Sequence, residues 1–516
     1  MRGPLITAVA VLLLAVISVS LYARRLQYAP VYLASDEIKF ALQARSIAET
    51  GRDLNGQFLP LYFSEPGFSA GRDPISIYVT ALFLKVLPFS ETTIRLPTAL
   101  VAVLDVIVMF FLARRIFKRE LLATLAAALL ALTPGHLIYG RSAVDVLYPL
   151  PFLLAWLLCL LAFLERGRLA SLFAATMLLG LGVYSYIAFM VMAPLYLLFT
   201  AIAIWERRSP KVYLVAAAGF LLPLTLLVRW YVQHPTQYND LIGAYRLYDT
   251  RLNPLQGIKD LSSYFSIGVR SAVYWDFFNP SFLFFSGDSS VMNSTRLAGV
   301  FLWPVGVFLI VGIRRALVRQ SPLDILLLAG LLTSPLAAVL LAEVALRRAL
   351  VMLPFVIVIA TSGIEVMIVS RRLAWRLAAV ALLVMLPMQF RAFYLDYMGD
   401  YRVRSSTWFG GNIRDALVGV MQRARHTSAT RVYVTNSIPF VDTYWRFYAI
   451  EHNREDLVPT FLDVKQFDAR AVPAPALLVV DVAGVPPEPV LQSAGWRRTQ
   501  VITEPNGTPS FAIYEK

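Results

Sequence analysis

The stretch that decides the fold covers residues 34–97 and contains ASDEIKFALQARSIAETGRD (34–53), AGRDPISIYVTALFLKVLP (70–88) and ETTIRLP (91–97). It follows an uncharged apolar run, 4–22, and precedes a second, largely apolar run, 98–112. The adjacent carboxylates Asp36 and Glu37 are therefore expected just outside a membrane span. Because charge held this close to lipid is costly, it commonly has a functional task.

The composition is that of a polytopic membrane protein. Of the 516 residues, 58% are hydrophobic and the mean hydropathy is +0.63, whereas most of the surface of a soluble protein must meet water. Several windows of about 20 residues carry no charge, which is the length that crosses roughly 30 Å of hydrocarbon. The net charge of +14 resides mainly in short loops between these windows, so it indicates topology rather than a nucleic-acid partner. A single cysteine, Cys159, excludes a disulfide framework.

Hydropathy predicts eleven spans, and the first is expected to remain uncleaved because its apolar run exceeds the usual 7–15 residues of a signal peptide. The spans are 4–22, 96–113, 121–139, 144–164, 169–185, 187–205, 212–232, 297–313, 323–342, 349–369 and 373–391. With a cytoplasmic N-terminus, five basic clusters fall on the cytoplasmic side, as the positive-inside rule requires. The clusters are Arg114, Arg115, Lys118 and Arg119; Arg166 and Arg168; Arg207, Arg208 and Lys211; Arg314, Arg315 and Arg319; and Arg371, Arg372 and Arg376.

The same topology places the 23–95 loop, the 233–296 loop and the C-terminal part outside. Apolar residues at helical spacing predict surface helices over 37–50 and 75–87 in the first outer loop. After about residue 392, short β-like runs at 431–436, 476–482 and 511–514 alternate with helical stretches. The predicted fold class is therefore an α-helical polytopic membrane protein with about eleven transmembrane helices (1–392) and a small C-terminal α/β soluble domain (393–516).

Two groups of acids are candidate catalytic residues. Asp36 and Glu37 either open a helix, where acids favour the macrodipole, or include a general base that accepts a hydroxyl proton. Arg141 and Asp145 are four residues apart and are expected on one helix face. They form either a structural ion pair or, with Asp145 pointing toward Asp36, part of a cavity. A divalent cation at Asp36 and Asp145 is possible, although no motif requires one.

Three arginines form the third candidate group. Arg72 begins RDP in the first outer loop, and Arg347 and Arg348 lie at the outer end of the tenth predicted span. Outward arginines beside lipid either snorkel to headgroups or bind phosphate, which a guanidinium contacts bidentately. The chain has no Walker A loop, GxGxxG, CxxC or HExxH motif, so nucleotide-driven transport, dinucleotide redox chemistry and zinc chemistry lack support.

At this point the motifs resemble a known family. Six motifs occur in order along the chain: the DE pair that opens an ALQAR helix, the RDP segment, IRLP, RSAVDVLYPL (141–150), FLFFSGD (282–288) and SPLAAVLLAEVALRRALVMLP (334–354). Together they resemble the bacterial PMT-like glycosyltransferases of the glycosyltransferase C superfamily (GT-C fold), which includes protein O-mannosyltransferases and aminoarabinose transferases. The resemblance covers about residues 1–395.

The resemblance implies a polyprenyl-phosphate-sugar donor and an inverting hexosyl or pentosyl transfer to a lipid, glycan or protein acceptor. It implies action on the non-cytoplasmic face of the bacterial inner membrane. Asp36 matches the catalytic acid of the first loop, Glu37 completes its DE pair, and Asp145 matches a second cavity acid. Arg72 stands where aminoarabinose transferases have the lysine of a KPP motif.

Two alternatives remain at this stage. A transporter or flippase of a lipid-linked glycan would favour ionisable residues deep within spans, whereas most of them here lie at the outer ends. An assembly protein that uses the C-terminal domain would leave the acids of the first loop unexplained.

Overall fold

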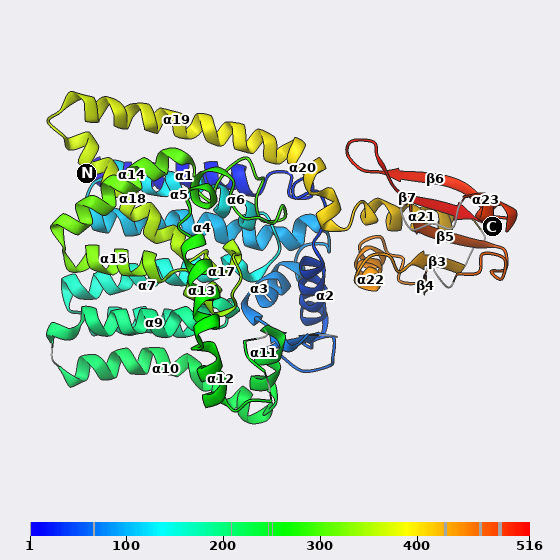
Figure 1. Ribbon diagram of the computed structural model, residues 1–516, viewed down its shortest axis with the longest axis horizontal. Helices are drawn as coiled ribbons and strands as arrows, with labels where there is room; N and C mark the ends of the chain where they lie inside the picture. Colours follow the sequence, from blue (N-terminus) through cyan, green and yellow to red (C-terminus); the bar gives the residue numbers. More distant parts are fainter. Residues whose placement is uncertain are drawn as a thin grey trace.

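The computed structural model describes residues 2–65, 68–207, 209–245, 247–249, 251–427, 431–463, 467–482 and 488–516, so Arg208 of the third basic cluster lies outside the described residues. Along its longest axis the molecule has a helical part that ends in an α/β part at the C-terminus (Figure 1). This arrangement confirms the predicted fold class, a polytopic helical protein with a small C-terminal sheet.

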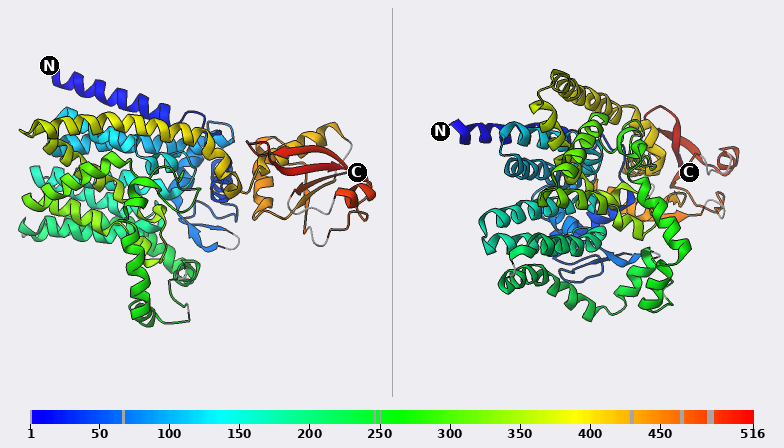
Figure 2. Two further views of the ribbon diagram at one scale, coloured as in Figure 1. Left: turned by 45° about the horizontal axis from the view of Figure 1, so that its top comes forward. Right: turned by 60° about the vertical axis from the view of Figure 1, so that its left-hand side comes forward.

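The helical part consists of long, roughly parallel helices, horizontal in Figure 1, together with shorter helical pieces that join or extend them. They are α1 (Arg2–Tyr22), α4 (Glu91–Phe117), α5 (Glu120–Ala131), α6 (Pro134–Gly140), η1 (Asp145–Leu147), α7 (Pro149–Arg166), α8 (Leu169–Gly182), α9 (Ile187–Ala203), η2 (Trp205–Arg207), α10 (Pro210–Gln233), α14 (Trp303–Arg319), α15 (Pro322–Thr333), α16 (Leu336–Leu340), α18 (Met352–Val369) and α19 (Leu373–Met398). Figure 2 shows α1 and α19 at the outside of the bundle, and only 17% of each apolar window is buried. Their exposed apolar side chains suit a lipid environment.

All eleven predicted spans fall on helices, but not all of these are long enough to cross a membrane. Seven described helices or joined helix runs are long and apolar enough, and eight if the pair α5 and α6, bent by 61°, counts as one span. The bend lies at Pro134, which lacks the N–H that would continue the α5 ladder. Helices α8, α9 and α14 have 14, 17 and 17 residues. The count of eleven spans therefore stays a prediction.

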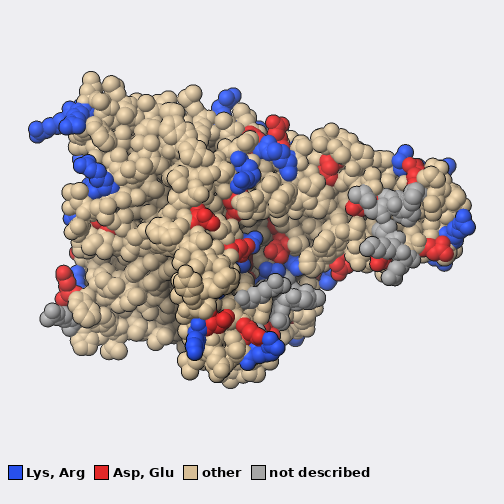
Figure 3. All heavy atoms as spheres, viewed as in Figure 1, with Lys and Arg blue, Asp and Glu red and all other residues tan. Residues whose placement is uncertain are grey.

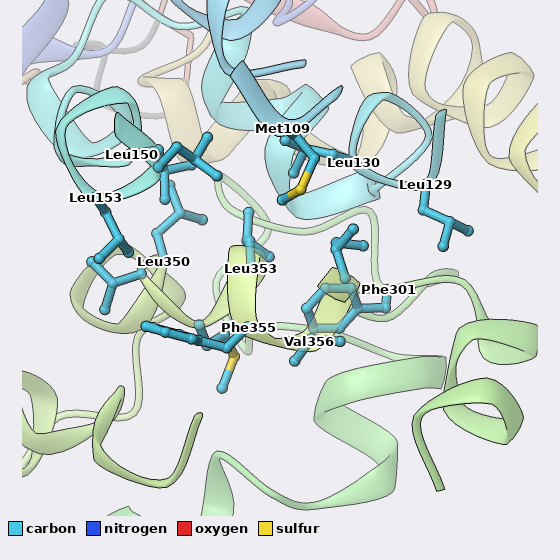
Figure 4. Close-up of a cluster of buried hydrophobic side chains, with 14 of the residues drawn as sticks. Met109, Leu129, Leu130, Leu150, Leu153, Phe301, Leu350, Leu353, Phe355 and Val356 are labelled. Carbon is cyan, nitrogen blue, oxygen red and sulfur yellow. The ribbon is translucent and has the colours of Figure 1, made fainter. Parts of the chain in front are cut away.

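The core of the bundle is a continuous apolar cluster between α4, α5, α7 and α18 (Figure 4). Its members include Met109, Leu129, Leu130, Leu150, Leu153, Phe301, Leu353, Phe355 and Val356. Two glycines allow α14 and α18 to approach closely. A Cβ on Gly312 would lie 2.0 Å from the carbonyl oxygen of Ile359, and one on Gly363 would lie 2.0 Å from that of Phe308. Small residues at such a crossing let the backbones touch, as in other membrane bundles.

Shorter elements cover one end of the bundle. The first outer loop folds into α2 (Ser35–Thr50), β1 (Phe63–Glu65), β2 (Phe68–Arg72) and α3 (Pro74–Leu84), so both predicted surface helices are present. From the later loops come α11 (Gln237–Tyr245), α12 (Pro254–Leu261), α13 (Tyr264–Asp276), η3 (Ser281–Phe285) and α17 (Leu346–Ala349). Figure 1 shows α12 and α13 running across the ends of the horizontal helices. These elements enclose the candidate site.

The C-terminal part is a five-stranded sheet in the order β4-β3-β5-β7-β6 with helices packed on it. It comprises α20 (Asp400–Ser405), η4 (Ser406–Phe409), α21 (Ile413–His426), β3 (Arg431–Thr435), α22 (Val441–Glu451), β4 (Pro459–Leu462), β5 (Ala476–Asp481), α23 (Glu488–Ser493), β6 (Arg497–Thr503) and β7 (Pro509–Glu515). Strands β3, β4 and β5 are parallel, and β7 is antiparallel to β5 and β6. The proposed boundary after residue 392 falls within α19, which continues to Met398.

The sheet part rests on the first outer loop. The Tyr444 hydroxyl of α22 donates to the Leu33 carbonyl oxygen at 3.0 Å. The Tyr32 hydroxyl donates to Glu504 Oε2 at 2.8 Å. Residues of α2 and α22 also share one apolar cluster, which contains Ile38 and Tyr448. The loop that carries Asp36 is therefore held from both sides, by the bundle and by the sheet part.

Candidate active site

Asp36 lies in the first turn of α2 and keeps its carboxylate accessible, with 47% of the side chain exposed. Its Oδ1 accepts a hydrogen bond from Arg72 Nη2 at 3.1 Å. Arg72 ends β2 and its guanidinium lies 5.7 Å from the centre of the Phe40 ring. The structure thus brings together the first-loop acid and the first-loop cation, which are 36 residues apart in sequence.

Asp145 and Arg348 join this pair from other parts of the chain. Asp145 begins η1 and lies within electrostatic range of Asp36, Arg72 and Arg348. Arg348 Nη1 donates to the Tyr186 hydroxyl at 2.9 Å, and its guanidinium lies 5.2 Å from the Tyr245 ring centre. In Figure 3, acidic and basic groups meet in a hollow over α2, α3 and α17.

Asp73 is a further acid of this cluster, and the sequence analysis did not single it out. It is buried, and its Oδ1 has no hydrogen-bond partner among the described residues. Burial raises the pKa of Asp73 well above its ordinary value, and the nearby charge of Asp145 raises it further. A hydrogen bond from the Ile187 N–H and the cations Arg72 and Arg348 oppose this shift. A raised pKa of this origin favours the protonated form of the carboxyl group.

Glu37 has a different role from its neighbour Asp36. The side chain is 1% exposed, and both carboxylate oxygens accept hydrogen bonds from the fully buried Arg95, at 2.8 and 3.0 Å. The backbone N–H groups of Ala143 and Ala34 donate to the same carboxylate, at 2.8 and 2.9 Å. With these four bonds Glu37 connects α2, α4 and the loop after α6, and we propose that it positions the site.

The expected helix face shared by Arg141 and Asp145 is not formed. Helix α6 ends at Gly140 because the chain turns before η1, so the two side chains are not one helical turn apart. Arg141 is fully buried and donates to backbone carbonyl oxygens at the end of α1 and in the segment after it, at 2.9–3.1 Å. The acceptors are Leu21, Tyr22, Arg25 and Ala29. Arg141 therefore fixes the chain that leads from α1 into the first outer loop.

The twin arginines at 347 and 348 also separate. Both contact Glu343: Arg347, with 40% of its side chain exposed, pairs with it from four residues away, and Arg348 Nε lies 3.6 Å from its Oε2. Arg348, which is more buried, also lies within electrostatic range of Asp73 and Asp145, as Arg72 does. We therefore assign only Arg348 of this pair to the acid cluster.

The described residues contain no group of three or more histidine, cysteine or acidic side chains arranged to hold a metal ion. Asp36, one of the two acids considered for a cation, is already paired with Arg72. The donor set at the cluster is thus two guanidinium groups and three carboxyl groups, a combination that suits an anionic phosphate beside a proton acceptor.

An apolar cavity of about 110 Å³ opens beside the cluster, between α9, α11 and α16. Its walls include Val191, Leu241 and Leu340, and Arg348 lies at its edge together with Tyr245. A cavity with apolar walls and one guanidinium suits an amphipathic ligand whose charged group faces the acid cluster.

Comparison with known proteins supports the same family. The family described as dolichyl-phosphate-mannose-protein mannosyltransferase matches residues 70–230. No curated protein matches the chain.

Solved structures share the fold over nearly the whole chain. The apo form of ArnT from Cupriavidus metallidurans has 15% sequence identity and a TM-score of 0.51, and the match covers 98% of this chain and 97% of that chain. The same protein bound to undecaprenyl phosphate has 14% sequence identity and a TM-score of 0.50, and the match again covers 98% of this chain and 97% of that chain. The apo oligosaccharyltransferase of Archaeoglobus fulgidus has 14% sequence identity and a TM-score of 0.50, and the match covers 98% of this chain and 74% of that chain.

Proposed function

Because residues 70–230 match the dolichyl-phosphate-mannose-protein mannosyltransferase family and the chain shares the fold of ArnT, we propose that it is a PMT-like glycosyltransferase that transfers a sugar from a polyprenyl-phosphate donor to a hydroxyl group. The observation that carries this proposal is the convergence of Asp36, Asp145, Arg72 and Arg348 beside an apolar cavity. The acceptor belongs to a lipid, a glycan or a protein.

Several features support a lipid-linked donor. The cavity beside Arg348 is apolar along its walls and charged at one edge, as a prenyl chain ending in phosphate requires. The matching family is named for a dolichyl-phosphate sugar, and ArnT was crystallised with undecaprenyl phosphate. Arg72 and Arg348 would contact the phosphate, because one guanidinium group can donate two parallel hydrogen bonds to two phosphate oxygens.

The chemistry follows from where the charges lie. An acceptor hydroxyl oxygen attacks the anomeric carbon while its proton passes to Asp36, and the bond between that carbon and the phosphate oxygen breaks. The leaving polyprenyl phosphate carries an additional negative charge, which Arg72 and Arg348 stabilise. A single displacement of this kind inverts the configuration at the anomeric carbon.

The pair of Asp36 and Arg72 links donor binding to base activation. Without donor, Arg72 donates to Asp36 at 3.1 Å. A phosphate competes for the same guanidinium, and a carboxylate that gives up this partner accepts a proton more readily. Asp73 and Asp145 then orient the acceptor by hydrogen bonding to its hydroxyl groups.

The proposed orientation places the site on the non-cytoplasmic face of a bacterial inner membrane. The protein is multi-pass, and Figure 3 shows basic side chains gathered at the end of the bundle opposite the sheet. By the positive-inside rule that end, with the N-terminus, is cytoplasmic. The division into a catalytic part, 1–392, and an extracytoplasmic α/β part, 393–516, belongs to the same proposal.

Donor selection tests the proposal directly. Purified protein in lipid nanodiscs receives a radiolabelled sugar either as polyprenyl phosphate ester or as nucleotide sugar, with total membrane lipids and glycans as acceptor. We expect transfer from the lipid-linked donor only, because the cluster offers phosphate contacts beside an apolar cavity. Efficient transfer from nucleotide sugar in the absence of a lipid carrier would contradict it.

A further inference from the structure

A second charged groove lies at the opposite end of the bundle from the acid cluster. It has a volume of about 760 Å³ and lies between the ends of α14 and α18 and the start of α19. Five arginines line it, and no acidic side chain is among its described lining residues. Figure 3 shows basic groups at this end of the molecule.

Three of the five guanidinium groups have no partner among the described residues. Arg315 is engaged, since its Nη1 donates to Glu365 Oε2 at 2.5 Å, and Arg319 Nε lies 3.6 Å from Asp324 Oδ2. The side chains of Arg314, Arg371 and Arg372 make no hydrogen bond or ion pair with any described residue. Three like charges around one groove repel each other unless an anion lies between them.

Apart from Ser370, the remaining lining is apolar. Ile310 and Val318 are 70% and 78% exposed, and Val366 and Trp375 also line the groove. Tryptophan is enriched where a membrane meets water, because its ring is apolar and its N–H is polar. The groove is thus charged at its rim and apolar toward the bilayer, as an acyl chain with a charged headgroup requires.

A neighbouring basic groove shows that this arrangement is not general at this end of the bundle. The groove lined by Phe111, Leu158 and Arg166 also contains Glu165. There Arg115 Nη2 pairs with Glu165 at 2.8 Å, and Arg114 Nε pairs with Glu120 at 2.7 Å. Among the described residues, acids pair with two of the four cations of that groove and leave Lys118 and Arg166, whereas the groove between α14 and α19 is lined by five arginines and no acid.

We propose that the groove between α14, α18 and α19 binds a phospholipid with an anionic phosphate headgroup. Arg314, Arg371 and Arg372 contact the phosphate, and the acyl chains lie along Ile310 and Val318. Basic pockets between transmembrane helices bind anionic headgroups in this manner. The site is separate from the acid cluster and does not rest on the proposed transferase activity.

The test compares two double variants of the full chain by native mass spectrometry in detergent. The groove variant is Arg314→Gln with Arg371→Gln. The control, Arg168→Gln with Lys211→Gln, removes two exposed positive charges that line neither groove. The added lipids are dioleoyl phosphatidylglycerol and dioleoyl phosphatidylcholine, and thermal unfolding checks that both variants fold.

We expect the wild type and the control to retain phosphatidylglycerol in preference to phosphatidylcholine. The groove variant should bind phosphatidylglycerol roughly 10- to 30-fold more weakly, since each basic residue near an anionic surface contributes a several-fold factor. Equal loss in both variants, or no preference between the two lipids, would overturn the proposal. Displacement of the lipid by inorganic phosphate alone would overturn it as well, because the ligand would then be a soluble anion.

Discussion

Asp36 and Glu37 are consecutive residues in the first turn of α2, and the structure gives them opposite environments. Asp36 is half-exposed and pairs with Arg72 at 3.1 Å. Glu37 is buried with four N–H donors within 3.0 Å. A carboxylate with free lone pairs can accept a proton, whereas one whose oxygens all accept hydrogen bonds is held in place. The DE pair therefore combines one accessible acid, which we propose as the reactive one, and one fixed acid.

The variant with the largest expected effect on turnover tests the proposed reactive acid, Asp36. Asp36→Asn keeps the size of the side chain but cannot accept a proton. We expect the turnover rate to fall by roughly 10²–10⁴-fold, while donor binding is retained or tightened because Arg72 loses its carboxylate partner. Initial-rate kinetics with the lipid-linked donor and a donor-binding assay separate these two quantities.

The matched control for this variant is Asp442→Asn. Asp442 is also an acid in the first turn of a helix, α22, but it is exposed and belongs to the sheet part. It should keep wild-type turnover. If Asp36→Asn turned over as fast as this control, the base would be another acid of the cluster, Asp73 or Asp145.

The second variant tests the fixed acid, Glu37, through its effect on stability. Glu37→Gln leaves the buried Arg95 without a counter-charge, and breaking a buried ion pair in this way costs about 3–5 kcal/mol. We expect a lower apparent unfolding temperature and a lower yield of folded protein, while the folded fraction keeps much of its turnover rate. Thermal unfolding in detergent and rates normalised to folded protein measure the two outcomes.

Glu49→Gln, on the same helix, is the control. Glu49 belongs to an exposed pair with Arg45, and exposed pairs contribute about 0–1 kcal/mol. A Glu37→Gln protein as stable as Glu49→Gln would mean that the four bonds do not hold the loop. A folded Glu37→Gln protein without any activity would instead place Glu37 in the chemistry.

The sequence predicts the helices of the bundle well, because long apolar windows have few other solutions in a membrane. It also identifies Asp36, Arg72, Asp145 and Arg348 as candidates, and the structure gathers these four. The partners of each side chain could not be predicted, since they come from distant parts of the chain. Glu37 and Arg95, for example, are 58 residues apart.

The residues that were misjudged show why. Arg141 binds carbonyl oxygens of an irregular segment, and no sequence pattern indicates which loop will lack backbone partners. Asp73 precedes Pro74 at the start of α3 and so resembles an ordinary helix cap, although its side chain makes no cap bond. Strands β4 and β6 were missed because much of their surface is exposed, so their sequences lack a clear alternation of apolar and polar residues.

The smallest effect concerns a third acid, Glu451, which lies where the sheet part meets the bundle. The pKa of Glu451 is raised from 4.5 to about 7, mainly by burial and also by the nearby charge of Glu91, while a hydrogen bond from the Glu91 N–H and the charge of Arg414 oppose the rise. Glu451 is largely enclosed, as Glu37 is, but its charged neighbours include a second acid, Glu91, as well as Arg414. This environment favours the protonated form of Glu451.

This difference gives a pH dependence of known sign. Between pH 4.5 and 7 the folded protein keeps the proton of Glu451 and the unfolded chain releases it, so stability falls as pH rises through this window. In the Glu451→Gln variant the side chain is uncharged at every pH, so this fall in stability does not occur. We expect its unfolding temperature to equal that of the wild type near pH 4.5 and to exceed it by roughly 2–4 °C at pH 8.

Glu455→Gln separates this effect from a general loss of negative charge. Glu455 is exposed and pairs with Arg45 at 3.4 Å, so its removal should leave the pH dependence of the wild type unchanged. A Glu451→Gln protein whose unfolding temperature followed the wild-type curve between pH 4.5 and 8 would contradict the argument. Glu451 would then be ionised in the folded state, and the contact between α22 and α4 would contain two carboxylates held together by Arg414.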